Sequence, residues 1–455
     1  MTTGEPSTSD GSRGARLVHI APLVPLLIVG VLAARSIKDN SFLWHIRAGS
    51  VQLSDQQVLN TDPFSFTRFD DVWRTQSWLA EFMYAGLEST FGGLAWVNWM
   101  VFFAGATVTA LVGLSVYRVV KSPVIVGFVL LVAVWLMGPF LQPRPVIFSF
   151  VLLAALVLTL QNTDRIAWII VPLIWIWAGV HGSWVIGGLL IVLELIRTKN
   201  TRLLWAGLGA LAASLATAHG FGTWQIVLDF FGSRDALALM EEWKPPEFAD
   251  IVQAPYFLLI VGVIVAAMRG KIAARDLIVI LPFMLFGMTS RRAVFPAAIV
   301  LIPWAAMAIP PLKASASALP RRLVAAVGAL MVLLAVSPLL LNPLGVLDPN
   351  RFPSSEILSA MPEGRAFHDD ATGGYFIYAE WPERHVYIDD RAELYGAEGL
   401  LAYQAARNGR YEATFDRYDL DVALTHIEWP LTAVLRDDGW AVAAEDDRFA
   451  VFLRP

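Results

Sequence analysis

Ionisable side chains at the ends of long apolar segments are the first candidates for chemistry in this sequence. An unpaired charge is costly at membrane depth, so ionisable residues there are functional candidates by default. Acids, arginines and one histidine make up the set: Asp39, Arg144, His181, Glu242, Arg291 and Arg292. Carboxylates together with arginines fit a site for an anionic, lipid-linked substrate, in which arginine holds a phosphate and a carboxylate acts as a base.

Each of these residues, taken alone, also has a simpler interpretation. Asp39 could be a solvated acid at a helix end, and Asp62 could only shape the turn in which it precedes a proline. Arg144 and Arg291 could be anchors that extend to the lipid headgroups. His181 could simply close a tight helical hairpin. The functional hypothesis therefore depends on several of these residues meeting on one face of the molecule.

The elements that must position these residues are long apolar runs. Of the 455 residues, 56% are hydrophobic and 16% are charged, whereas soluble domains average about 45–50% apolar and about 25% charged residues. The uncharged runs predict a mainly α fold, a polytopic bundle of about eleven transmembrane helices. The predicted spans are 17–35, 93–117, 122–141, 145–161, 165–180, 183–196, 203–219, 252–268, 276–290, 293–310 and 322–341.

Lysine and arginine in the short connecting loops orient this bundle. With the N-terminus in the cytoplasm, these residues concentrate in the cytoplasmic loops, as the positive-inside rule requires. They include Arg118, Lys121, Lys199, Arg202, Arg269, Lys271, Arg275, Arg321 and Arg322. The same orientation places the candidate residues and the C-terminal domain together on the outer side of the membrane.

Composition divides the chain into three parts. Residues 1–16 are polar and predict a disordered cytoplasmic tail. Residues 17–345 predict the transmembrane domain, with long outer loops at 36–92 and 220–251, of which the first has the pattern of amphipathic helices on the membrane surface. Residues 346–455 predict a soluble extracytoplasmic α/β domain. In that domain we expect strands at 385–388, 421–425 and 449–453, and helices at 398–408 and 412–418.

Charge and cysteine content exclude several classes of function. The net charge of −5 gives no reason to expect a nucleic-acid partner. The absence of cysteine excludes disulfides, thiol nucleophiles and cysteine metal sites. One charged pair has a structural explanation, because Glu194 and Arg197 are three residues apart and share a helix face.

Several short motifs follow one another in a characteristic order. They are Lys38 to His45 around Asp39, Asp62-Pro63-Phe64-Ser65, Trp78-Leu79-Ala80-Glu81, Arg144-Pro145, His181-Gly182-Ser183, Glu242-Trp243 and Tyr387 to Gly396. Their order resembles a bacterial branch of the GT-C superfamily of membrane glycosyltransferases, and the resemblance covers most of the chain. Members transfer a sugar from a polyprenyl-phosphate or polyprenyl-pyrophosphate carrier on the non-cytoplasmic side of the membrane.

The resemblance implies roles for individual residues. Asp39 matches the catalytic acid and would be the general base of an inverting transfer. Many members have a second acid next to it; here Asn40 follows, so Asp62 becomes the second catalytic candidate. The remaining candidates would bind substrate: His45, Glu81, Arg144, His181, Glu242, Arg291 and Arg292. A divalent cation is the one candidate cofactor, although none is certain. The location would be a bacterial plasma membrane, with membrane lipid around the protein and a glycan, lipid or protein as acceptor.

Other functions remain open on the sequence alone. A lipid-linked oligosaccharide polymerase or ligase would use the same donors. A transporter would also line a cavity with aspartate and arginine, but no pseudo-symmetric repeat is detected. A non-catalytic scaffold for envelope polysaccharide would need the C-terminal domain but not Asp39. The Asp389-Asp390-Arg391 segment of that domain would either help to recognise the acceptor or be a solvated strand end.

Overall fold

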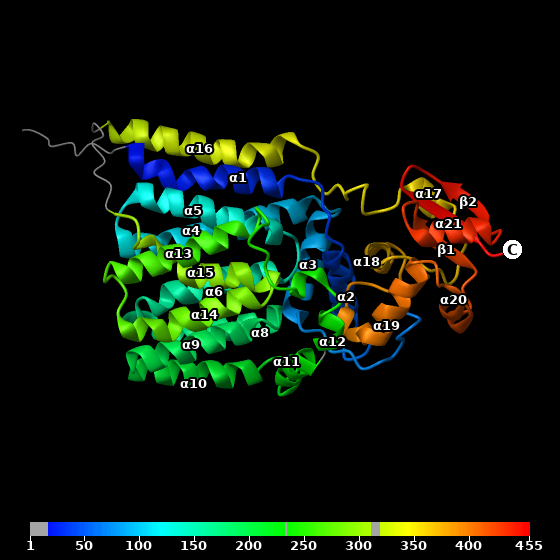
Figure 1. Cartoon of the computed structure of the whole chain (residues 1–455), viewed down its shortest axis with the longest axis horizontal. Helices are drawn as coiled ribbons and strands as arrows, with labels where there is room; N and C mark the ends of the chain where they lie inside the picture. Colours follow the sequence, from blue (N-terminus) through cyan, green and yellow to red (C-terminus); the bar gives the residue numbers. More distant parts are fainter. Residues whose placement is uncertain (1–16, 233, 311–318) are drawn as a thin grey trace, which may run out of the picture.

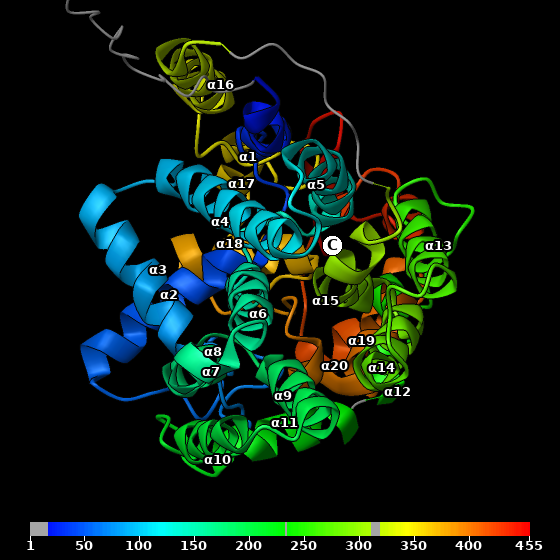
Figure 2. The same ribbon diagram turned by 90° about the vertical axis from the view of Figure 1, so that its left-hand side faces the viewer.

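Each long apolar run of the sequence forms a helix, and these helices lie side by side in one bundle (Figures 1 and 2). The computed structural model describes residues 17–232, 234–310 and 319–455, so the predicted tail at 1–16 lies outside the described residues. The bundle helices are α1 (Val24–Ala33), α4 (Ala95–Val120), α5 (Pro123–Met137), α6 (Val146–Leu160), α8 (Ile170–Val180), α9 (Trp184–Thr198), α10 (Thr201–Leu215), α13 (Ala254–Met268), α14 (Leu277–Thr289), α15 (Val294–Ala306) and α16 (Arg321–Leu341).

Three helices are long and apolar enough to cross a membrane by length and composition. They are Ala95–Val120, Pro123–Phe140 and Arg321–Leu341. Several other bundle helices are apolar but shorter, and a helix of about 15 residues extends only about 22 Å, less than the ~30 Å hydrocarbon core. The fold is therefore mainly helical and compatible with a membrane, while the count of about eleven spans stays a prediction.

Local signals explain the tight turns between neighbouring helices. The Ser122 hydroxyl accepts a hydrogen bond from the backbone N–H of Ile125, and Pro123 occupies the first turn, so α5 begins at once after α4. Asn200 caps α10 in the same way. Close helix packing depends on Gly30, because a Cβ atom there would lie 1.8 Å from the carbonyl oxygen of Ala335 in α16.

The first long loop contains α2 (Ser41–Asp55) and α3 (Trp78–Phe91), so the prediction of helices there is confirmed. The prediction that they lie on the membrane surface is wrong for α2, because most of its side chains are buried by protein. Helix α2 packs against α3 on one side and against α18 (Asp370–Ala379) of the C-terminal domain on the other. Figure 1 shows α2 and α3 between the bundle and that domain.

The C-terminal domain is a small α/β unit at one end of the bundle, which we call the domain end; the opposite end is the far end (Figure 1). Its antiparallel sheet has the order β1-β3-β2. Its elements are β1 (Val422–His426), β2 (Ala441–Glu445), β3 (Phe449–Leu453), α17 (Ser355–Ser359), α18, α19 (Ala392–Arg407), α20 (Glu412–Tyr418) and α21 (Pro430–Asp437). The strands expected at 421–425 and 449–453 and both expected helices are confirmed.

Several details of this domain differ from the prediction, and the helices α17, α18 and α21 were not expected. The segment 385–388 is not a strand, because Val386 forms only an isolated bridge to Ser65 of the first loop. Strand β2 was missed, since its sequence of mostly alanine carries a weak strand signal. The bridge at Val386 is part of a larger contact in which Trp44, Phe64 and Trp73 of the first loop share one core with the domain. The first loop and the C-terminal domain therefore form one packed body.

Candidate functional site

Three carboxylates meet at the Arg144 guanidinium at the domain end. Arg144 Nε donates a short hydrogen bond to Asp39 Oδ2. Its other nitrogens lie 3.8 Å from Asp390 Oδ2 and 3.9 Å from Glu242 Oε2. Asp39 follows α1, Arg144 precedes α6, and Glu242 and Asp390 belong to the second loop and the C-terminal domain. The structure thus joins parts of the chain that are distant in sequence.

The two central side chains are fixed by their own surroundings. The Asp39 side chain is 1% exposed, and its Oδ1 accepts the backbone N–H of Ser41 at 3.0 Å. The neighbouring Asn40 amide donates to the carbonyl of Asp370 at 2.9 Å, so Asn40 docks this segment on α18 and is not a second acid of the site. The hydroxyl of Tyr84 donates to the carbonyl of Pro143 at 3.0 Å and holds the segment that carries Arg144.

The second loop reaches the site through Glu242. Its Oε1 lies 2.7 Å from Arg292, whose guanidinium also covers the Trp243 ring at 5.2 Å. Burial lowers the pKa of Arg292, and Arg144 adds to this, while Glu242 opposes it. Arg291 instead pairs with acids of the loop itself, at 2.7 Å from Glu247. We define the arginine–carboxylate cluster as Asp39, Arg144, Glu242, Arg292 and Asp390.

Asp390 is the acid of this cluster that sequence reasoning did not assign to the site. Trp44 Nε1 donates to Asp390 Oδ1 at 2.6 Å. Burial raises the pKa of Asp390 to about 6, against the effect of Arg144 and together with that of Asp39. Its neighbours Asp389 and Arg391 are each 1% exposed, so the alternative of a solvated strand end is wrong. The charged run at 389–391 was the available signal, but its contact with Arg144 depends on how the domain docks.

The structure does not bring Asp62 to the cluster. Asp62 is fully buried, and its Oδ1 accepts from Phe64 N at 3.1 Å and from Arg391 at 2.8 Å. Its Oδ2 accepts from Ser65 N at 3.1 Å. Arg391 also donates to Asp389 at 2.8 Å. Both oxygens of Asp62 are therefore occupied, by donors of its own loop and by Arg391, which joins the loop to the C-terminal domain; this removes Asp62 as the second acid.

Glu81 lies behind His45 and cannot reach a substrate itself. It is fully buried and accepts from His45 Nδ1 at 2.9 Å and from Gln52 Nε2 at 2.6 Å, with a further short bond from the Thr75 hydroxyl. The His45 ring contacts the neighbouring Trp44 ring in a tilted arrangement, with 3.5 Å between ring centroids. Glu81 therefore acts on its surroundings through the imidazole that it holds.

His181 remains neutral at the turn between α8 and α9. Burial lowers its pKa to about 3, and the charges of Arg292, His45 and Arg144 contribute to this shift. Its Nδ1 accepts the backbone N–H of Ser183 at 3.1 Å, so the neutral ring carries its proton on Nε2. His181 is thus a hydrogen-bond donor that lies within electrostatic range of the cluster.

The charges of the cluster decide whether it could bind the candidate divalent cation. The carboxylates converge on a guanidinium, so a cation would have to replace Arg144 among them. Within residues 17–232, 234–310 and 319–455, no group of three or more histidine, aspartate or glutamate side chains is placed to hold a metal ion. The donor set therefore does not fit a metal, and we derive no step through one.

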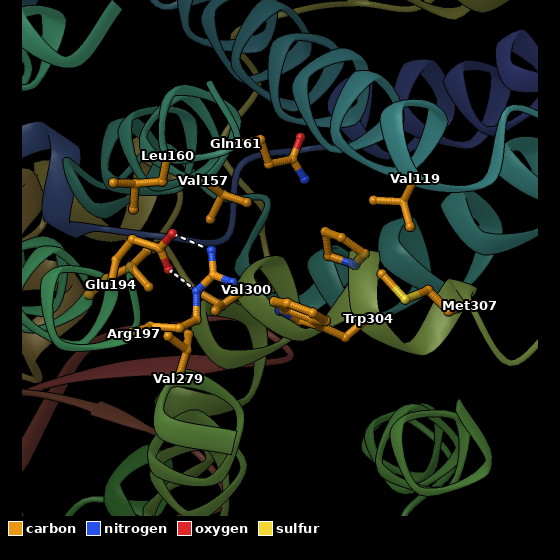
Figure 3. A pocket seen from close by; sticks show the side chains of 12 residues that line it. Val119, Val157, Leu160, Gln161, Glu194, Arg197, Val279, Val300, Trp304 and Met307 are labelled. Atoms are coloured by element: carbon orange, nitrogen blue, oxygen red, sulfur yellow. Dashed lines mark hydrogen bonds and ion pairs between the residues drawn. The ribbon is translucent and has the colours of Figure 1, made fainter. Parts of the chain in front are cut away.

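A separate pocket of about 140 Å³ lies at the far end of the bundle (Figure 3). It is lined mainly by apolar side chains near the ends of α6, α9 and α15 that are opposite to the cluster. The predicted pair is confirmed here, with Arg197 Nε at 2.8 Å from Glu194 Oε2, and Asp276 accepts from Arg197 at 2.8 Å. These groups satisfy one another and are not part of the site.

The structure leaves Asp62 and Arg291 outside the cluster, and Glu81 contacts His45 rather than the cluster. It brings together Asp39, Arg144, Glu242 and Arg292, with His181 within electrostatic range of both arginines. Such a cluster can bind an anion through its two arginines and can accept a proton through a carboxylate or an imidazole. The chain matches no protein-family model and no curated protein.

Proposed function

We propose that this protein is a membrane glycosyltransferase of GT-C type. It would move a sugar from a polyprenyl-phosphate or polyprenyl-pyrophosphate donor to a hydroxyl of a glycan, lipid or protein acceptor in the cell envelope. One observation carries the proposal: the half-buried Arg144 is held by carboxylates from three separate segments at one end of an apolar helix bundle. A phosphate can take over such an arginine, because phosphate and carboxylate bind guanidinium in the same way.

The proposed location is the bacterial plasma membrane, with about eleven spans and the N-terminus in the cytoplasm. Large apolar side chains are exposed around the bundle, among them Phe128 (61%), Trp205 (61%) and Leu285 (65%), as expected for contact with lipid. The far-end loops carry basic residues including Lys121, Arg202, Lys271, Arg275 and Arg322. By the positive-inside rule the far end is cytoplasmic, and the cluster faces outward.

The proposed reaction follows from the cluster. The donor phosphate binds Arg144 and Arg292, with a hydrogen bond from His181 Nε2–H. Because Arg144 then pairs with the phosphate, Asp39 is released and can take the proton of the acceptor hydroxyl. The acceptor oxygen attacks the anomeric carbon from the face opposite the phosphate. The bond from that carbon to the phosphate oxygen breaks, and the carrier phosphate leaves with the electron pair, stabilised by both arginines.

The test uses the full chain in nanodiscs with a panel of radiolabelled polyprenyl-phosphate sugars, with and without divalent cation. Wild type is compared with Asp39→Asn and with Asp55→Asn, a control at an exposed acid on the end of α2. We expect transfer of one sugar, lowered roughly 10²–10⁴-fold by Asp39→Asn if Asp39 is the base and unchanged by Asp55→Asn. Saturable carrier binding without turnover by wild type would contradict the transferase and favour a transporter or scaffold.

A further inference from the structure

The pair of His45 and Glu81 has the geometry of an oriented imidazole base. An ionised carboxylate only accepts hydrogen bonds, so the 2.9 Å contact between Glu81 Oε1 and His45 Nδ1 places a proton on Nδ1. In the neutral ring, Nε2 then carries a lone pair. Gln52 and Thr75 hold the same carboxylate, and the Trp44 ring packs against the imidazole at a tilt of 32°, so the orientation of the imidazole is fixed.

The Nε2 atom of His45 is free to accept a proton. The residue as a whole is only 5% exposed, yet Nε2 has no hydrogen-bond partner within the described part of the chain. It is also not among the fully buried polar atoms that lack a partner, so part of its surface is accessible. A histidine kept only for core packing would have both nitrogens satisfied. His368 shows this arrangement, with Nδ1 at 2.8 Å from the Asp369 carbonyl and Nε2 accepting from Tyr387 N at 3.0 Å.

His45 also lies beside the arginine–carboxylate cluster. Trp44, whose ring contacts His45, donates a hydrogen bond to Asp390. The charges of His45, Arg144 and Arg292 act on the same buried imidazole of His181. The titratable groups that contact His45 are Glu81 and Tyr84 from α3. His181, in the turn after α8, is within electrostatic range of His45, and Arg144 acts on that same His181. Asp390 lies on the other side of Trp44.

We infer that His45, oriented by Glu81, is the group that removes the proton from the acceptor hydroxyl, an inference that rests on the proposed transferase function. Asp39 uses one oxygen for Ser41 N–H and the other for Arg144, whereas His45 offers an unoccupied acceptor. The hydroxyl proton passes to Nε2, the acceptor oxygen bonds to the anomeric carbon, and the carrier phosphate leaves with the electron pair of the broken bond. Glu81 stabilises the imidazolium, which then returns its proton to water. His45 thereby replaces Asp39 as the base of the proposed reaction, and Asp39 becomes a positioning residue that holds Arg144.

The first test does not require turnover. Diethyl pyrocarbonate acylates unprotonated imidazole nitrogens, and mass spectrometry locates the product on the full chain in nanodiscs. We expect rapid modification of His45, slowed by polyprenyl phosphate, and at least tenfold slower modification of His368, whose nitrogens are both occupied. Modification of His45 no faster than that of His368 would overturn the inference.

The second test compares transfer by wild type, His45→Gln, Glu81→Gln and the control His385→Gln in the C-terminal domain. We expect His45→Gln to lower kcat roughly 10²–10⁴-fold with donor KM unchanged. In a further variant, His45→Ala, added imidazole should restore part of the lost rate. Glu81→Gln removes the charge that favours imidazolium, so the acid limb of its pH–rate profile moves to lower pH. An active wild type with kcat preserved in His45→Gln overturns the base assignment alone. Absence of transfer by wild type overturns the proposed function and the base role with it.

Discussion

Replacing Arg391 by alanine should separate the first loop from the C-terminal domain. Arg391 is 1% exposed and donates to Asp389 at 2.8 and 2.5 Å and to Asp62 at 2.8 Å. Its guanidinium also lies 4.5 Å from the Trp73 ring centroid. Burial lowers the pKa of Arg391, but the negative charges of Asp389 and Asp62 raise it by more than burial lowers it. The net pKa is raised, so the side chain stays charged. The variant leaves two buried carboxylates without their shared cation.

The size of the effect follows from that uncompensated charge. Removing one partner of a buried ion pair costs about 3–5 kcal/mol, which is roughly a 100- to 4,000-fold change in the equilibrium between the closed and open contact. Hydrogen exchange in nanodiscs measures this opening at the amides that bridge the two parts. These are Phe66 N, which donates to the Val386 carbonyl at 3.1 Å, and Val386 N, which donates to Phe64 at 3.0 Å.

The matched control is Arg410→Ala, at an exposed arginine of the same domain. It should change the exchange of these amides by less than about 1 kcal/mol, as is typical of surface charges. If Arg391→Ala also stays below about 1 kcal/mol, the buried network does not hold the two parts together. Asp62 would then again be a candidate for catalysis.

Three further predictions concern the same architecture. Burial raises the pKa of Asp390 to about 6, so its contribution to stability is greatest at low pH and is lost as pH rises through about 6. Asp390→Asn should therefore stabilise the protein more at pH 7 than at pH 4.5 in thermal unfolding. An equal effect at both pH values would refute the raised pKa. Gly30→Ala should cost about 1–3 kcal/mol, since its Cβ would meet the Ala335 carbonyl, whereas Gly86→Ala meets nothing within 4 Å and should not destabilise; equal melting temperatures would contradict this packing. Deleting residues from Leu347 onward removes Asp390 and uncovers Trp44. Sugar transfer should then be lost, and protease should cut the first loop faster. A truncated protein with full activity and only altered acceptor choice would contradict a site built jointly by the bundle and the C-terminal domain.

Local sequence determined the helices of the bundle and several of their ends. Uncharged apolar runs such as Val146–Leu160 form helices wherever they are placed in an apolar setting, and Ser122 and Asn200 mark helix starts because their side chains satisfy free backbone N–H groups. The pairing of Glu194 with Arg197 also followed from spacing alone, since residues three apart share a helix face. The type of residue at Asp39, Arg144, Glu242 and Arg292 was sufficient to propose an anion site.

Only the tertiary structure decided which acids belong to that site. The sequence favoured Asp62 as the second acid and did not assign Asp390 to the site, but Asp62 is turned toward Arg391 and Asp390 toward Arg144. Asp62 and its partner Arg391 are 329 residues apart in the sequence. No local periodicity encodes such a contact, because it arises when the first loop and the C-terminal domain bury Trp44, Phe64 and Trp73 in one core. The burial of that core orients the charged side chains around it, and so assigns one acid to the scaffold and the other to the site.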